Sequence, residues 1–594
     1  MLTVCTGCKP CRPSESYVHL GFEPGTEGGS CRVPVIGGTY DGRVARQVLE
    51  SERGLVTSTD AATSGFTPPR VLPDWPSTPP STIERLRVAM PTDRINGWIV
   101  TLIIGAIAFV IRYVNLGYPN KLVFDETYYA KDAYSLLKFG YERDWPSNAN
   151  SKIITGNVDV MQDSAAFVVH PQFAKWLIAA GEQLFGMNSF GWRFASLVFG
   201  TLLIMVTIRL VRRVSKSTMI GGLAGILLTF DGLTFVMSRT ALLDIFMAFF
   251  LVAAVACLVA DREWFRNRLA RYLERRELAD LGGRFGPALI LRPWRIAAGV
   301  CFGLALGTKW NALFPLAAFA LLSLAWDVGA RRLAGAGSRT KLSIVRDGIP
   351  AFISLVVLSV VVYVGTWASW LLTSGGYDRA WGQEHPEHVT VRLLGKPLAS
   401  LLHYQYDIWN FHTGDFINHA QHTYRADPAG WLIVARPIGI DAVNNIKPGT
   451  DGCLGPDNCI RVISGVGTPA LWWVAIFALV AAAILWVGGR DWRFGVPVVG
   501  VLSSWLPWFA FDSRPLFFFY AIAIIPFSVM AVALCAGWIL GDAQAGDRRM
   551  VAAIVIGAFV ALVAANFAYL YPILTDELLA YPKWLSRMWF RSWI

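Results

Sequence analysis

Residues 467–488 read GTPALWWVAIFALVAAAILWVG, and this run contains no charged residue. A helix needs about 20 predominantly apolar residues to cross the hydrocarbon core of a bilayer, so the run predicts a membrane span. Further apolar runs of the same kind bring the expected number of transmembrane helices to about eleven. The other runs are 95–114, 190–211, 217–237, 241–260, 294–309, 310–326, 348–373, 494–511, 515–540 and 550–571.

The composition of the 594-residue chain agrees with a membrane protein. Hydrophobic residues make up 54% and charged residues 16%, whereas a soluble protein carries roughly 45–50% and about 25%. The mean hydropathy is +0.44. These values argue against a soluble multidomain enzyme, a disordered chain and a disulfide scaffold. We expect an all-α polytopic membrane protein.

The charges between the spans predict the orientation. If the amino terminus is cytoplasmic, the inside loops hold 22 basic and 10 acidic residues, and the long outside loops, 112–171 and 375–466, hold 13 and 16. Cytoplasmic loops are enriched in Lys and Arg. We therefore expect a multi-pass protein of the plasma membrane with its carboxyl terminus outside. The net charge of +11 then reflects orientation and not nucleic-acid binding.

The chain divides into four expected regions. Residues 1–94 are rich in Gly, Pro, Ser and Thr and predict a disordered cytoplasmic tail. Residues 95–373 form a membrane region that carries the first outside loop. Residues 374–466 form a long extracytoplasmic loop, and 467–594 form a second membrane region with an extracytoplasmic tail. We expect interfacial helices in both long outside loops.

Two groups of cysteines differ in their expected role. Cys453 and Cys459 lie in the second outside loop, and disulfides persist outside the cytoplasm, so we expect them to be bonded to each other. The tail holds a second group, Cys5, Cys8, Cys11 and Cys31. A zinc knot there is the less favoured interpretation, because no histidine or folded context accompanies these cysteines.

Asp125 and Glu126 follow the first span in the sequence VFDETYYAKD. A lone acid there would be explained by the dipole of a helix start. This pair is followed by Asp132, by the segment HPQFAKW at 170–176, and by Arg193 at the outer end of the second span. A carboxylate that accepts a proton, together with cations that hold a phosphate, indicates group transfer.

The sequence lacks the marks of several other transferases. It has no Gly-rich phosphate loop and no Asp-x-Asp pair, and the first outside loop has no paired histidines. This favours a donor that is already in the membrane and a reaction without an obligatory metal or cofactor. The need for a divalent metal stays open.

The chain resembles the dolichyl- or polyprenyl-phosphate-mannose–protein O-mannosyltransferases of the GT-C superfamily, and bacterial, actinobacterial-type members in particular. The resemblance covers about residues 95–594. It rests on Asp125-Glu126, His170-Pro171 with Lys175, Trp192-Arg193-Phe194, SRTALLD at 238–244, GLALGTKW at 303–310, HTYRADPAGW at 422–431 and Arg436-Pro437. The chain departs from the family pattern at Gln172, Phe173, Ala174, Ala426 and Ala429.

The resemblance implies a GT-C fold and the transfer of mannose, with inversion, from polyprenyl-phosphate-mannose to Ser or Thr hydroxyls of secreted or membrane proteins. Asp125 would be the general base, and Glu126 would orient the acceptor or nearby cations. The donor phosphate would be held by Arg193, with Lys309 and Arg514 as further candidates. Both of these also fit side chains that extend from the ends of spans to the lipid headgroups. Further substrate-binding candidates are Asp132, His170, Lys175, His422, Tyr424 and Trp431.

The expected partners also follow from the resemblance. They are the lipid-linked donor, Ser/Thr-rich polypeptide acceptors, the bilayer and the Sec translocon, beside which the family works. Nucleic acid is not expected.

Other interpretations remain beside this one. A GT-C transferase of another sugar, aminoarabinose or arabinofuranose, would share the same plan. A transporter would use intramembrane charges such as Asp231, Arg239 and Asp244. Of these, Arg239 and Asp244 are five residues apart, and we expect them to form a structural ion pair.

Four histidines stand in an aromatic-rich stretch of the second outside loop: His403, His412, His419 and His422. They could be read as a zinc cluster. The neighbouring aromatic residues favour an interfacial helix that lies on the membrane, and we prefer this interpretation for all of them except His422.

Overall fold

The computed structural model describes residues 80–541 and 546–594, which belong to one compact unit, Thr78–Ile594. Most of the predicted tail, with its cysteine group, lies outside the described residues. The described chain is mostly helical, as the composition predicts.

Every predicted span contains helix. The helices are α3 (Arg94–Tyr113), α7 (Ser189–Ser215), α8 (Thr218–Thr229), α10 (Asp244–Arg275), α11 (Pro293–Leu306), α12 (Leu313–Leu333), α13 (Ser343–Phe352) with η4 (Ile353–Val357) and α14 (Leu358–Gly365), α20 (Pro469–Val487), α21 (Trp492–Trp505), α22 (Ile525–Leu540) and α23 (Asp547–Leu574). Within the described residues, 7 helical segments are long and apolar enough to cross a membrane, and α8, α11 and α22 are shorter apolar helices. The expected number of eleven spans is therefore not confirmed.

Helix α10 lies inside the bundle, and α3 and α23 lie on its outside. In the most apolar stretch of α10, 78% of the residues are buried, against 28% in α3 and 22% in α23. A helix that is apolar all round is buried in a protein core or faces lipid. The exposed apolar side chains of α3 and α23 therefore form surfaces suited to lipid.

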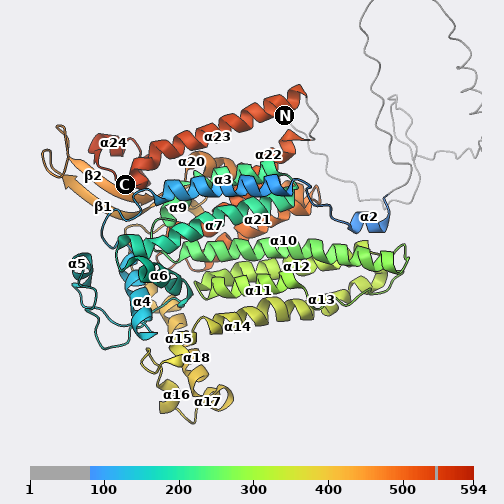
Figure 1. Cartoon of the computed structure of the whole chain (residues 1–594), viewed down its shortest axis with the longest axis horizontal. Helices are drawn as coiled ribbons and strands as arrows, with labels where there is room; N and C mark the ends of the chain where they lie inside the picture. Colours follow the sequence, from blue (N-terminus) through green and yellow to red (C-terminus); the bar gives the residue numbers. More distant parts are fainter. Residues whose placement is uncertain (1–79, 542–545) are drawn as a thin grey trace, which may run out of the picture. The chain divides into compact units, whose positions relative to one another are not determined.

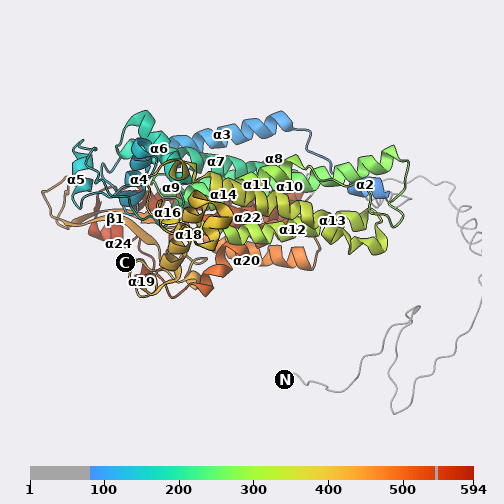
Figure 2. The ribbon, with the colours of Figure 1, turned by 90° about the horizontal axis from the view of Figure 1, so that it is seen from below.

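The helices of both long outside loops gather at one end of this bundle, and α2 lies at the other end (Figures 1 and 2). The first loop contributes α4 (Glu126–Phe139) and α5 (Ala149–Ile154), and α6 (Phe173–Phe185) follows it directly. The segment after α14 contributes α15 (Ala368–Leu372), α16 (Trp381–Glu384), α17 (Val389–Leu394), α18 (Lys396–Thr413) and α19 (Asp415–Asn418).

The all-α prediction misses a small antiparallel sheet at the same end. Strand β1 (Ile438–Ile446) pairs with β2 (Cys459–Gly465), and β2 pairs with β3 (Leu579–Ala580), which follows α23. The structure joins Cys453 and Cys459 in a disulfide that closes the β1–β2 connection. The sheet thereby ties the second outside loop to the C-terminal segment, which continues into α24 (Tyr581–Leu585).

Two breaks in the apolar runs place charged residues, Asp231 and Lys309, between helices. The third run is interrupted where Asp231 caps the short helix α9 (Gly232–Met237) and accepts hydrogen bonds from the Thr234 amide at 2.8 Å and the Trp472 indole at 2.7 Å. The chain is then non-helical until α10 begins at Asp244. A second break places Lys309 in extended backbone between α11 and η2 (Trp310–Ala312).

The predicted tail ends earlier than residue 94. Residues Thr82–Leu86 form the short helix α2, which begins with a capping box between Ser81 and Glu84. Leu86 is fully buried and packs with Phe265 and Leu269 of α10. The expectation of disorder is therefore wrong for this stretch, because a short apolar contact with a long helix is enough to order it.

Candidate active site

Asp125 lies at the N-terminus of α4 and is half-buried. The Tyr129 hydroxyl, one turn later, donates a hydrogen bond to the Asp125 carboxylate at 3.4 Å. Burial raises the pKa of Asp125 to about 6, against the opposing charge of Lys309, and the Asp244 carboxylate adds to the rise. A carboxylate with a pKa close to neutral is well matched to general-base catalysis.

The neighbouring Glu126 is fully buried and fully hydrogen-bonded. Its Oε1 accepts from Arg193 Nε at 2.8 Å and from the Ala241 amide at 3.0 Å. Its Oε2 accepts from Arg193 Nη2 at 2.9 Å and from the Val123 amide at 3.1 Å. These bonds use the acceptor capacity of both oxygens. Glu126 therefore anchors the loop, and Asp125 is the member of the acidic pair with capacity left for chemistry.

Arg193 is equally committed to the loop. Besides the two bonds to Glu126, it donates to the carbonyls of Leu116 at 3.3 Å, Pro119 at 3.0 Å and Lys121 at 2.9 Å. An arginine has five N–H donors, and all of them are used. The prediction that Arg193 holds the donor phosphate disagrees with this geometry, because no N–H remains for an anion.

Lys309 and Asp244 form a buried ion pair beside Asp125. The Lys309 ammonium donates to both Asp244 oxygens at 2.9 Å and lies 4.3 Å from the centre of the Tyr520 ring. The predicted ion pair between Arg239 and Asp244 is wrong. Arg239 instead donates to the backbone carbonyls of residues 112, 114 and 115, where the chain leaves α3.

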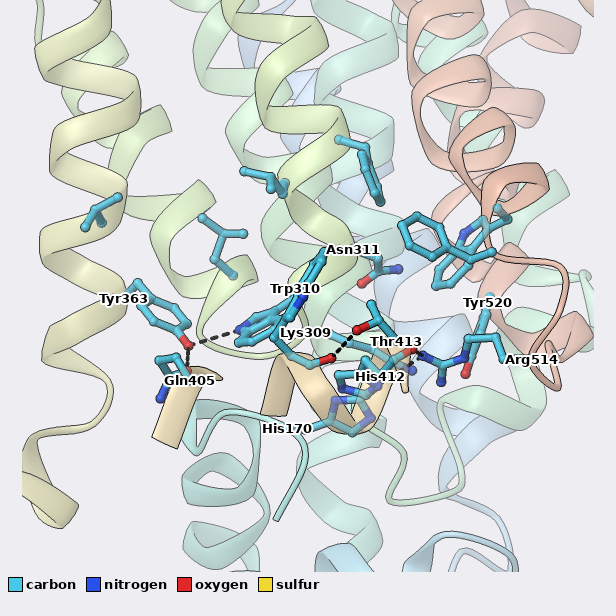
Figure 3. Close-up of a pocket in the computed structure, with 17 residues that line it drawn as sticks. His170, Lys309, Trp310, Asn311, Tyr363, Gln405, His412, Thr413, Arg514 and Tyr520 are labelled. Atoms are coloured by element: carbon cyan, nitrogen blue, oxygen red, sulfur yellow. Dashed lines mark hydrogen bonds between the residues drawn. The ribbon is translucent and has the colours of Figure 1, made fainter. Parts of the chain in front are cut away.

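A cavity of about 420 Å³ opens next to this ion pair (Figure 3). Its volume falls in the usual range for small-molecule sites. Most of its wall is apolar, formed among others by Leu306, Leu313, Phe314, Val360, Trp508 and Phe511. Lys309, Arg514, His170 and His412 also line it. The cavity is therefore amphiphilic, with an apolar wall and a cationic part.

His412 holds Arg514 at the cavity. Its Nδ1 accepts a hydrogen bond from Arg514 Nη1 at 3.0 Å, so its proton is on Nε2, which donates to the Val169 carbonyl at 2.9 Å. Burial and the Arg514 charge lower the pKa of His412 to about 4, so the imidazole is neutral. The ring of His170 stacks on it with a centroid distance of 5.4 Å.

Arg514 has donors to spare. Its Nε is buried and makes no hydrogen bond within the described part of the chain. In Figure 3 its guanidinium lies beside His412. A guanidinium that is fixed on one side and unsatisfied on the other is suited to bind an anion.

Comparisons with known proteins identify the family. Residues 102–273 match the family model described as dolichyl-phosphate-mannose-protein mannosyltransferase, and residues 397–593 match the C-terminal four-transmembrane region of protein O-mannosyltransferases. The polyprenol-phosphate-mannose–protein mannosyltransferase of Mycobacterium tuberculosis is 38% identical over 517 residues, which are 85% of this chain and 93% of that protein. This chain belongs to that family.

Other relatives agree with this assignment and confirm the family predicted from the motifs. The mannosyltransferase of Mycolicibacterium smegmatis is 36% identical over 90% of this chain and 99% of its own length. That of Corynebacterium glutamicum is 32% identical over 83% of this chain and 92% of its own. The S. cerevisiae Pmt1–Pmt2 complex bound to the sugar donor superposes with a TM-score of 0.64 at 12% identity, covering 86% of this chain and 94% of that one. The fold is therefore shared.

His170 and Lys175, which belong to one predicted motif, lie in two different environments. His170 reaches the cavity, but Lys175 is buried between Asp132 at 3.1 Å and Glu142 at 3.0 Å. Gln172 also donates to Glu142, at 2.7 Å. Asp132 and Lys175 were predicted to bind substrate. Their mutual bonding indicates that they fasten α4 to α6 instead.

The second predicted group, in the HTYRADPAGW segment, is likewise divided. His422 is exposed and packs edge-on against Phe124, the residue before Asp125, at a centroid distance of 6.1 Å. Tyr424 packs against Gly439 of β1. Trp431 has no exposed surface, and its indole donates to the Ala426 carbonyl at 3.2 Å. Of the three, His422 is the exposed one, whereas Trp431 belongs to the core.

Sequence reasoning gave no active-site role to Asp244, His412 and Tyr520. Asp244 and Lys309 are far apart in the chain, and no local pattern pairs them. His412 was assigned to an interfacial helix, and it does lie on α18, but on the side that lines the cavity. The neighbouring residue in sequence, Phe411, does not indicate that the His412 side chain faces the cavity.

The Glu126–Arg193 pair yields a stability prediction. Removing one partner of a buried ion pair leaves an uncompensated charge and costs about 3–5 kcal/mol. We expect Glu126→Gln and Arg193→Met each to lower the Tm of the detergent-solubilised chain. The double variant should lose less than the sum of the two, because neither charge then remains unpaired.

Thermal unfolding followed by tryptophan fluorescence measures this cycle. The matched control is the exposed pair Glu387–Arg392, with side chains 86% and 64% exposed. Glu387→Gln and Arg392→Met should hardly change the Tm. Additive losses at Glu126 and Arg193 would contradict the role of the pair in holding the loop.

Proposed function

We propose that this chain transfers mannose from polyprenyl-phosphate-mannose to Ser or Thr hydroxyls of secreted or membrane polypeptides, with Asp125 as the general base. The observation that carries the proposal is the amphiphilic cavity, whose lining cation Lys309 interacts electrostatically with Asp125, a half-buried carboxylate with a pKa of about 6. Membership of the mannosyltransferase family supports the donor and the reaction.

The cavity matches the two chemical parts of such a donor. An isoprenoid chain is purely apolar and suits a wall of Leu, Val, Phe and Trp side chains. The phosphate carries the negative charge and suits Arg514 and Lys309. Of these two cations, Arg514 has an unsatisfied Nε–H, so we assign it the direct contact. The Lys309 ammonium already donates to Asp244. We therefore assign it a role through its positive charge, which attracts the phosphate over a short distance.

The proposed reaction is a single displacement. The acceptor hydroxyl oxygen forms a bond to the anomeric carbon while Asp125 takes the hydroxyl proton. The bond from the anomeric carbon to the phosphate oxygen breaks, and the polyprenyl phosphate leaves with its negative charge stabilised by Arg514 and Lys309. One displacement inverts the anomeric centre. Base catalysis of this kind contributes about 10²–10⁴-fold.

The proposed orientation places this chemistry on the extracytoplasmic face. The basic loops remain inside by the positive-inside rule, and the end of the bundle with α4, α18 and the sheet faces outward. The lipid-linked donor then enters from the bilayer and the polypeptide from the aqueous side. Coupling to the Sec translocon belongs to the same proposal.

The direct test is transfer of radiolabelled mannose from polyprenyl-phosphate-mannose to a Ser/Thr-containing peptide by membranes that carry the chain. We expect Asp125→Asn to lose transfer by about 10²–10⁴-fold. Asp163→Asn, which changes a fully exposed acid of the same loop, should retain it. Equal labelling by wild type and Asp125→Asn would overturn the base assignment, and no labelling by wild type would overturn the sugar or the acceptor.

The pH dependence gives a second prediction. Asp125 must be ionised to accept the proton, so kcat/KM should rise with pH and level off above the pKa of about 6. Below it, kcat/KM should fall about tenfold per pH unit. Steady-state assays between pH 4.5 and 8 measure this limb. If the residual activity of Asp125→Asn showed the same fall of kcat/KM at low pH, the titrating group would be a residue other than Asp125.

The third prediction concerns the donor phosphate. His412→Phe keeps a ring next to His170 but cannot accept from Arg514. A hydrogen bond to a charged group is worth about 1.5–3 kcal/mol, so we expect His412→Phe and Arg514→Lys to raise KM for the donor roughly 10- to 100-fold. Arg392→Lys, on the exposed side of α17, is the control. If both cavity variants left the KM for the donor unchanged, the donor phosphate would bind at another place.

A further inference from the structure

We propose that Asp378, His403 and Asp407 form a binding site for a divalent first-row transition-metal ion such as Zn²⁺ or Mn²⁺. His403 and Asp407 are one helical turn apart on α18 and therefore share a face. Asp378 reaches them from the segment between α15 and α16. One ligand atom from each of the three side chains lies within 4.8 Å of the others. The site does not include the residues assigned to mannose transfer.

The spacing of these atoms fits a shared cation. His403 Nε2 lies 3.6 Å from Asp378 Oδ2 and 4.0 Å from Asp407 Oδ2. Both distances are too long for a hydrogen bond, which spans 2.7–3.2 Å for N–H···O. A metal bound at about 2.0–2.2 Å from each ligand separates the ligand atoms by roughly 3–4 Å.

The three side chains also lack hydrogen-bond partners within the described part of the chain. Among the hydrogen bonds of residues 80–541 and 546–594, none involves the side chain of Asp378, His403 or Asp407, and Asp378 Oδ2 is shielded from water. A shielded carboxylate oxygen without a partner is unfavourable. Arg379, the adjacent cation in sequence, does not supply one, because its guanidinium donates to the carbonyls of Trp370 and Leu371.

The ligand set selects the class of metal. Two carboxylates and one imidazole offer anionic oxygen ligands and one nitrogen ligand. Imidazole suits zinc and other first-row transition metals, whereas Ca²⁺ and Mg²⁺ prefer sites made of oxygen alone. The Trp381 ring stacks on His403 at 4.3 Å with an interplanar angle of 15°. This contact fixes the imidazole plane before a metal arrives.

Such a metal would brace α18. The same helix carries Tyr404, whose hydroxyl bonds to the Val168 amide at 3.0 Å and to the Val168 carbonyl at 3.1 Å, two residues before His170. It also carries His412 at the cavity. A cation between α18 and Asp378 would therefore stabilise the folded second outside loop, without taking part in the transfer reaction.

The test uses the purified full chain in detergent, stripped of metal with EDTA and without donor lipid. Mn²⁺ is the main probe, because the tail cysteines at positions 5, 8, 11 and 31 would favour Zn²⁺. Bound Mn²⁺ is counted by electron paramagnetic resonance, and the Tm is measured with and without Mn²⁺. The variants are His403→Ala and the near-isosteric Asp407→Asn, and His419→Ala, an exposed histidine of the same loop, is the matched control.

We expect wild type and His419→Ala to bind Mn²⁺ with the same affinity and to gain Tm with it. In His403→Ala and Asp407→Asn the affinity should fall at least tenfold, and Mn²⁺ should no longer raise the Tm. The metal-free Tm of the near-isosteric Asp407→Asn should match that of the metal-free wild type, which shows that this variant folds. Equal Mn²⁺ binding by wild type and both variants, or an equal gain in Tm, would overturn the proposal.

Discussion

The buried ion pair between Glu126 and Arg193 is the interaction on which the arrangement of the site depends. It joins the start of α4 to α7, and the same two side chains also bind the chain at residues 116–123 and at Ala241. The segment after α3, the break before α10 and the first outside loop therefore meet at one guanidinium and one carboxylate. Charges this deeply buried are stable only when their hydrogen bonds are complete, and here they are.

Unused bonding capacity separates the chemical groups from the structural ones. Arg193, Glu126, Lys175 and Arg239 are charged and conspicuous in the sequence, but their partners are protein groups. Asp125 has one long hydrogen bond from Tyr129, and Arg514 keeps an unsatisfied Nε. Because burying an unsatisfied polar group is costly, a ligand that completes the bonding of such a group at the cavity would be stabilised there.

The sequence predicts the features that are local and misses those that depend on distant contacts. Apolar runs locate the helices, since each run is its own signal, and the Asp125-Glu126 pair stands out against an apolar background. The local sequence does not show which of the two acids is structural, because that depends on the hydrogen bonds of Glu126 with Arg193 and Ala241. The pairing of Asp244 with Lys309, the burial of Trp431 and the β1–β2–β3 sheet depend on segments brought together from far along the chain.

The charges around Asp125 solve a conflict within the site. A leaving phosphate requires nearby cations, but a cation beside the base lowers the pKa of that base and weakens its ability to take a proton. Lys309 does lower the pKa of Asp125, and Asp244 raises it again. By accepting both bonds from Lys309, Asp244 offsets the charge of the ammonium as felt by Asp125. The cation thus remains at the cavity while the pKa of the base stays near neutral, which is the condition for both parts of the displacement to proceed in one site.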